Sequence, residues 1–153
     1  SDVSQEQARL LARLSAGRVG WALSASQDEK SLLHRQQDLD KLVELLHANR
    51  IERLAFAEQA SRESASARRR LEFWTCWWRD LLLVQAGADG EAVKNVVNAD
   101  RLAEFSTMAD QLTLYQTVAG LKALQEAASQ LDANVNARLA WEGLLLQLPH
   151  WRS

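Results

Sequence analysis

Residues 71–85 read LEFWTCWWRDLLLVQ, and this stretch decides the fold class. A helix buries one face when its apolar residues recur at steps of three and four, and this stretch follows that spacing. The residues on the face are Leu71, Trp74, Trp78, Leu81, Leu82 and Gln85, with Trp77 beside it. Gly87 follows, and glycine commonly ends a helix. We therefore predict a long helix here, with Trp74 and Trp78 in the core.

Helical spacing continues on both sides of this stretch. A capping-box spacing at Ser4 predicts a first helix that ends at Gly17, and a polar break is expected over residues 61–67. The other expected helices cover residues 28–48, 51–57, 100–110, 111–131 and 136–148, with Pro149 after the last. In the helix over residues 111–131 the expected buried stripe is Leu112, Tyr115, Val118, Leu121, Leu124 and Leu131.

The composition agrees with helices throughout. The 153 residues include one Pro and six Gly, whereas sheet-rich folds need many Gly and Pro in tight turns. Residues 1–48 contain a Gly-x-x-Gly turn, whereas the helices after residue 49 have thicker apolar faces. We therefore predict an all-α fold, with a small helical bundle over residues 1–48 and a larger one over residues 50–153.

The charge balance and the cysteine content indicate which partners and which cellular compartment to expect. The 18 Lys and Arg against 20 Asp and Glu give a net charge of −2, which excludes a strongly basic, phosphate-binding body. Cys76 is the one cysteine, so no internal disulfide can form, and we expect a cytoplasmic protein. No apolar run is long enough to span a membrane, so we expect no membrane partner.

Catalytic and cofactor motifs are not visible in the sequence. The three histidines, His34, His47 and His150, have no ligand spacing with one another or with Cys76. No Gly is followed by Lys, as a Walker A loop requires, and the segment Gly17-Arg18-Val19-Gly20 is typical of a helix end and turn. We expect no metal, no cofactor and no catalytic residues.

A group of arginines lies before the tryptophan-rich helix, at Arg62, Arg68, Arg69 and Arg70. Arginines interleaved with aromatic rings can bind single-stranded nucleic acid by stacking and phosphate contacts. The helical spacing of Trp74 and Trp78 favours a core role for the rings instead. The arginines are then expected to form a solvated face or to pair with acids of a neighbouring subunit.

Glu142 lies within an otherwise apolar helix. A carboxylate that is buried there needs a charged or hydrogen-bonding partner. Arg138, four residues earlier, is one candidate partner, and the Arg79–Asp80 pair is another. We interpret Glu142 as a structural contact rather than as a general acid.

Three strings carry a resemblance to a known family. They are LARLSAGRVGWAL at residues 11–23, WWRDLLLV at residues 77–84 and NVNARLAWEGLLLQLP at residues 134–149. In this order and spacing they resemble the lid and the C-terminal collar domain of bacterial clamp-loader subunits, which belong to the AAA+ proteins. Among these, the chain is most similar to subunits of the delta-prime type in the DNA polymerase III clamp loader.

The resemblance implies a lid-like subdomain over residues 1–48 and a collar domain over residues 50–153, as the C-terminal part of a longer protein. The collar joins five subunits into a ring, so the implied function is non-catalytic oligomerisation. The implied partners are the gamma/tau and delta subunits, with the sliding clamp and primed DNA reached through the assembled complex. ATPase subunits of the family have a lid arginine that touches nucleotide, and Gly20 stands at that position here.

The resemblance places the functional residues at surface positions beside the core. The predicted contacts are Arg79, Asp80, Arg138 and Glu142 as polar residues that set the register of subunits, and Trp77 and Trp141 as apolar ones. Two alternatives stay open. One is the C-terminal region of the gamma/tau ATPase subunit, and the other is a free-standing helical domain that binds single-stranded nucleic acid or acts as an enzyme.

Overall fold

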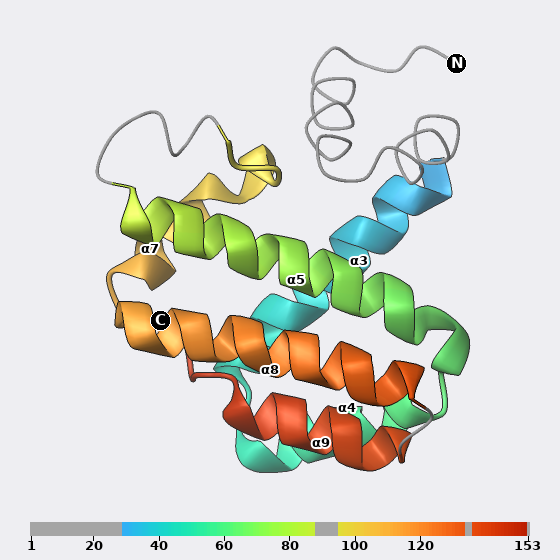
Figure 1. Cartoon of the computed structure of the whole chain (residues 1–153). Helices are drawn as coiled ribbons and strands as arrows, with labels where there is room; N and C mark the ends of the chain where they lie inside the picture. The colour runs from blue at the N-terminus through green and yellow to red at the C-terminus, as the bar shows by residue number, and fades with distance from the viewer. Residues whose placement is uncertain (1–28, 88–94, 134–135, 153) are drawn as a thin grey trace.

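The computed structural model describes residues 29–87, 95–133 and 136–152. Over these residues every regular element is a helix, so the all-α prediction is confirmed (Figure 1). The elements are α3 (Glu29–His47), α4 (Arg50–Ser61), α5 (Ser64–Ala86), the short 3₁₀ helix η1 (Ala99–Arg101), α7 (Leu102–Ala109), α8 (Leu114–Asp132) and α9 (Ala137–Gln147). None of these helices is long and apolar enough to cross a membrane.

Side-chain caps set several helix ends. The Asn49 side chain accepts a hydrogen bond from the backbone amide of Glu52 at the start of α4. The Asn136 side chain accepts hydrogen bonds from two backbone amides in the first turn of α9. Thr113 and Gln116 form a reciprocal capping box, so α8 begins at Leu114 rather than at residue 111 as expected. Gly87 caps α5 as predicted. The polar break is shorter than expected, because α5 already begins at Ser64.

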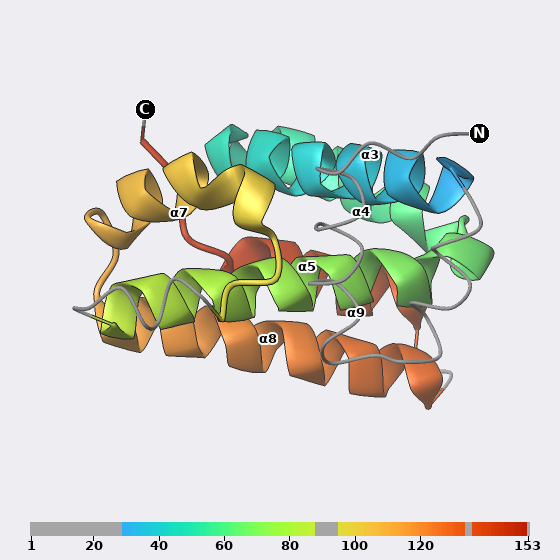
Figure 2. The same ribbon diagram turned by 90° about the horizontal axis from the view of Figure 1, so that it is seen from above.

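Helix α5 is the central element of the bundle. It packs against α3, α7 and α8, while α9 packs against α4 and α8. Figure 2 shows α5 between α3 on one side and α8 on the other. A helix with neighbours on several sides must be apolar around most of its circumference. This position explains why four bulky residues of α5 are all buried: Phe73, Trp74, Trp77 and Trp78.

Tryptophan rings form the centre of the core. Trp74 and Trp78 are 0% exposed, which confirms their predicted core role. The ring of Trp74 meets that of Trp141 edge-on, with centroids 5.6 Å apart. Phe56 of α4 packs against both of these rings, at 6.0 Å and 6.1 Å. These edge and tilted contacts join α4, α5 and α9 through aromatic packing, which adds to the energy of area burial.

The buried face of α8 differs from the predicted stripe. Its buried residues are small ones around Leu124: Thr117, Gly120, Ala123 and Ala127. Tyr115, expected in the stripe, is 82% exposed, so that part of the prediction is wrong. The reason is Trp78, whose indole nitrogen donates to the carbonyl of Thr117 at 2.6 Å. Only small residues of α8 leave room for its ring.

Helix α3 lies in the same hydrophobic core as the later helices. Leu39, Leu42, Leu45 and Leu46 belong to one cluster with the tryptophans of α5. The predicted boundary near residue 49 therefore falls inside a continuous core, and the packing of α3 weighs against it. The division into two domains stays a prediction. The first expected helix, with Gly17 and Gly20, lies outside the described residues.

Candidate functional site

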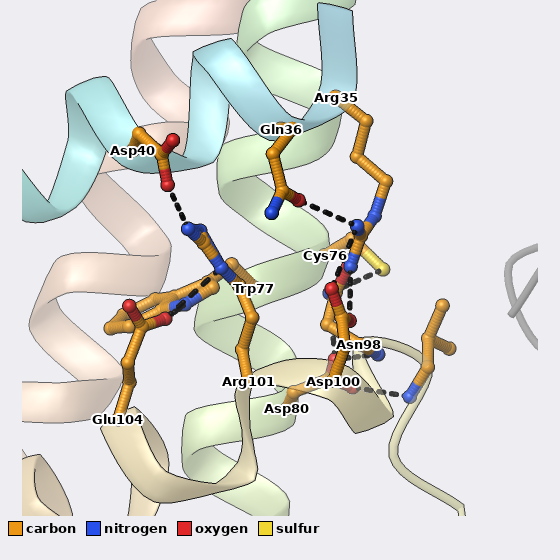
Figure 3. A network of polar contacts seen from close by, with 11 residues as sticks. Arg35, Gln36, Asp40, Cys76, Trp77, Asp80, Asn98, Asp100, Arg101 and Glu104 are labelled. Carbon is orange, nitrogen blue, oxygen red and sulfur yellow. Dashed lines mark hydrogen bonds and ion pairs between the residues drawn. The ribbon is translucent and has the colours of Figure 1, made fainter. Parts of the chain in front are cut away.

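A polar network joins α3, α5 and the segment around η1, and it includes Asp80 of α5 (Figure 3). The Asp80 side chain is 1% exposed. It accepts hydrogen bonds from the amide of Val97 at 3.0 Å, the amide of Asn98 at 2.7 Å and the side-chain amide of Asn98 at 2.7 Å. Burial raises the pKa of Asp80, and these donors oppose that rise. Asp80 therefore holds the chain after α5 against that helix.

Arg35 of α3 approaches the same segment from the other side. It is 1% exposed, and two of its nitrogens donate to the side-chain oxygen of Asn98 at 3.1 Å and 2.7 Å. It also forms a forked pair with the carboxylate of Asp100, at 3.1 Å and 2.6 Å. A forked guanidinium–carboxylate pair fixes orientation as well as distance. Arg35 thus fixes residues 98–100 to α3.

A second arginine completes the network. Arg101 pairs with Asp40 of α3 and with Glu104 of α7, the latter at 3.2 Å. Glu104 in turn accepts the indole N–H of Trp77 at 3.3 Å. These contacts bind the start of α7 to α3 and α5 at once (Figure 3).

The groups in this network bind one another, and their role is structural. Its carboxylates and its amide are each bonded to partners within the network, and Cys76 accepts a weak bond from Asn98 at 3.7 Å. Among the described residues no group of three or more His, Cys, Asp or Glu could hold a metal ion. This network of charged and polar residues therefore positions helices.

Asp80→Ala is expected to lower the free energy of unfolding by about 2 kcal/mol, because buried donors are left without an acceptor. Urea unfolding followed by circular dichroism measures this value. The exposed Asp110→Ala variant is the control and should stay within about 0.5 kcal/mol of the parent. Equal stability of the two variants would contradict the role given to Asp80.

Two of the predicted surface contacts lie in the core instead. Trp77 is 0% exposed and Trp141 is 1% exposed, so their expected surface position is wrong. Both face neighbouring helices because α5 and α9 are each packed on more than one side. Asp80 is likewise buried, in the network described above. In this conformation these three side chains do not reach a surface that a partner can touch.

The remaining predicted contacts lie at the surface. Arg79 is exposed on α5. Arg138 donates to Glu142 at 3.0 Å, which confirms the partner predicted from their spacing. The Arg79–Asp80 pair is not the partner of Glu142, because Asp80 points into the network around Asn98.

Acids of the same chain hold most of the arginine group. Asp38, 3% exposed, accepts from Arg69 at 3.0 Å and from Arg70 at 3.4 Å. Arg62 pairs with Glu58 at 2.9 Å. The expectation of acids from a neighbouring subunit is therefore corrected for these three. The expected solvated face holds for Arg62, whose side chain is 72% exposed, and is wrong for Arg70, which is buried. Their charges are neutralised at short range, which leaves less positive potential for a nucleic acid backbone.

Sequence reasoning missed Arg53, a buried cation with five hydrogen bonds. Arg53 of α4 is 6% exposed and donates to five backbone carbonyls. The acceptors are Leu45 at 2.9 Å, Leu46 at 3.3 Å, Leu145 at 2.8 Å, Leu148 at 2.6 Å and Pro149 at 2.9 Å. Burial lowers the pKa of Arg53. A signal was present, since Arg53 shares helical spacing with the buried Phe56, Ala57 and Ala60.

These acceptors explain what Arg53 does. The last carbonyls of a helix have no partner within the helix and carry partial negative charge. The guanidinium binds such carbonyls at the ends of α3 and α9 together. The chain after α9 also returns to α3, where the amide of Trp151 donates to Leu46 at 2.8 Å. Arg53 therefore closes the bundle where α3, α4 and α9 meet.

Comparison with known families decides the assignment. The family described as DNA polymerase III, delta subunit, C terminal, matches residues 29–150, which is most of the chain. The chain belongs to this family. The comparisons with curated proteins and with solved structures gave no match. The family assignment confirms the resemblance to the C-terminal region of a DNA polymerase III clamp-loader subunit, and the match begins at the first residue of α3.

Proposed function

We propose that this chain is the collar part of a delta-prime-like clamp-loader subunit, and that it acts as a non-catalytic module that joins subunits. The observation that carries the clamp-loader part of the proposal is the delta C-terminal family match over residues 29–150. The delta-prime type rests on the resemblance of the sequence strings at residues 11–23, 77–84 and 134–149. The proposed partners are the gamma/tau and delta subunits, and the assembled complex would load the sliding clamp onto primed DNA. A cytoplasmic location is part of the proposal.

A non-catalytic role is supported by how the chain uses its buried charges. Asp80, Arg35 and Arg53 all bind other parts of the same chain, and these contacts fix helices in place. The delta-prime type is supported over the gamma/tau type by Gly20, which stands where the ATPase subunits have an arginine. No nucleotide contact is proposed for the chain.

Reconstitution tests the proposal. The chain is mixed with purified gamma/tau and delta subunits, and complexes are measured by sedimentation velocity. We expect the chain to join a complex that already contains delta. Competition with delta for the same place would instead assign the chain to the delta type. If gamma/tau and delta form a complex and the added chain sediments separately from it, the subunit-joining function is wrong.

Oligonucleotide titration tests the alternative of single-strand binding. We expect no binding of a single-stranded oligonucleotide by the isolated chain, because Arg62, Arg69 and Arg70 are paired internally. The titration is repeated at two salt concentrations, since phosphate-driven binding weakens steeply with salt. Tight, salt-sensitive binding would favour the nucleic acid alternative.

A further inference from the structure

An open groove lies between α5 and α8 on the side of these helices where no other described helix packs. Its volume is about 550 Å³. Ala67 and Leu71 of α5 and Ala128 and Leu131 of α8 line it with apolar atoms. The lining residues belong to the start of α5 and the end of α8. These two helices run antiparallel (Figure 1).

Apolar residues recur along the groove side of α8 toward the start of the helix, with the polar Gln125 between them. Two bonds fix the register of the helix pair, from Trp78 to Thr117 and from Gln85 to Leu112. In this register the groove side of α8 continues from Ala128 at steps of three and four. The residues at these steps are Gln125, Leu121, Val118 and Leu114.

This stripe is only partly covered by the fold. Leu114 is 52% exposed, while Val118 and Leu121 are half-buried. The sequence predicted Val118 and Leu121 in a buried stripe, and the fold buries the neighbouring small-residue face instead. An apolar strip left at a surface and edged by charge is typical of an interaction site.

The opposite wall, on α5, carries two cations. Arg68 and Arg79 are exposed on the same side of the helix, and within the described residues neither has a hydrogen bond or an ion pair. They are eleven residues apart, which is three helical turns or about 16 Å. Glu72 lies between them and Asp132 lies at the far end of the groove. The wall therefore offers two positive charges at a spacing that a second helix can match.

We propose that this groove binds an amphipathic helix of a neighbouring clamp-loader subunit. The apolar face of that helix covers Leu114, Val118 and Leu121, and two of its acidic side chains, three turns apart, pair with Arg68 and Arg79. The proposal rests on the subunit-joining function above and specifies the face that serves it. The outer face of α9 is a poorer candidate, since its Arg138 is already paired with Glu142.

Charge reversal on the α5 wall tests the groove. The double variant Arg68→Glu/Arg79→Glu is titrated against the gamma/tau–delta complex, next to the parent chain. We expect its Kd to be about tenfold higher or more, because like charges then face each other across the interface. Leu114→Asp should also raise the Kd, by loss of apolar contact. The control is Arg50→Glu/Arg62→Glu, at the first residue of α4 and at the residue that follows its end. This double variant changes the net charge equally and lies outside the groove.

Each outcome decides the proposal. Weaker binding in the two groove variants, with parent-like binding in the control and unchanged circular dichroism in all, supports it. If the parent chain binds and the groove variants bind as tightly, the groove is not the binding site. The subunit-joining function then still stands. If the control variant loses as much affinity as the groove variants, the net charge of the chain determines binding. This outcome also contradicts the proposal that the groove is the binding site. If the parent chain does not bind, both proposals fail.

Discussion

Arg53→Met is expected to lower the free energy of unfolding by about 4 kcal/mol, a loss typical of a broken buried polar cluster. Methionine fills a similar volume but cannot donate a hydrogen bond. The carbonyls at the ends of α3 and α9 then lose their common donor. Because these carbonyls lie in the interior, water does not replace the lost bonds without opening the end of the bundle.

The geometry of the guanidinium explains the size of this effect. Its Nε and two Nη atoms reach carbonyls in three directions, between 2.6 Å and 3.3 Å. Lysine keeps the charge but presents it as a single point with three donors. Arg53→Lys should therefore lose only about half as much free energy of unfolding as Arg53→Met does.

Urea unfolding of Arg53→Met, Arg53→Lys and an Arg62→Met control measures these values. Arg62 lies at the end of the same helix and pairs at the surface with Glu58, so its loss should cost less than about 1 kcal/mol. A parent-like midpoint for Arg53→Met would show that the five contacts add nothing to stability. Equal stability of the lysine variant and the parent would reduce the role of Arg53 to its charge.

Local signals in the sequence are sufficient to predict the helices and the contacts between side chains of one helix. The end of α5 follows from Gly87, a residue type that commonly ends helices, and the end of α9 lies just before Pro149. Arg138 and Glu142 meet because four residues is one helical turn. Each of these predictions needs only residues that are close along the chain.

Contacts between helices could not be predicted in the same way. Trp77 lies outside the main apolar face of α5, and it is buried because α7 covers that side with Phe105, 5.1 Å from its ring. Asp80 is buried because residues far along the chain supply its donors, with Asn98 eighteen positions away. Both depend on which helices become neighbours, and helical periodicity does not carry that information.

Gly120 provides the second large expected effect, and it tests the close approach of α8 to α5. A methyl group at this position would lie 2.5 Å from two ring carbons of Trp78. Carbon atoms in contact are normally about 3.5–4.0 Å apart, so one of the two helices must move. Gly120→Ala should lower the free energy of unfolding by about 3 kcal/mol, at the upper end of the usual cost of overpacking.

Trp78 has little freedom to make room for that methyl group. It is 0% exposed, its ring lies 5.6 Å from that of Trp77, and its indole N–H is bonded to the Thr117 carbonyl. A shift of the ring would break that bond or displace the neighbouring tryptophan. The strain must therefore separate α5 from the face of α8 that carries its small residues.

Gly143 offers a control that uses the same substitution. A methyl group there meets only the side-chain nitrogen of Gln147, at 4.0 Å, and the position is within α9. Alanine in an open helical position is more favourable than glycine by about 0.5–1 kcal/mol, so Gly143→Ala should stabilise the protein. Thermal and urea unfolding of both variants should thus give shifts of opposite sign. If Gly120→Ala also stabilises, the helices are not packed as closely as the Trp78 ring requires, and the register on which the groove between α5 and α8 depends is wrong.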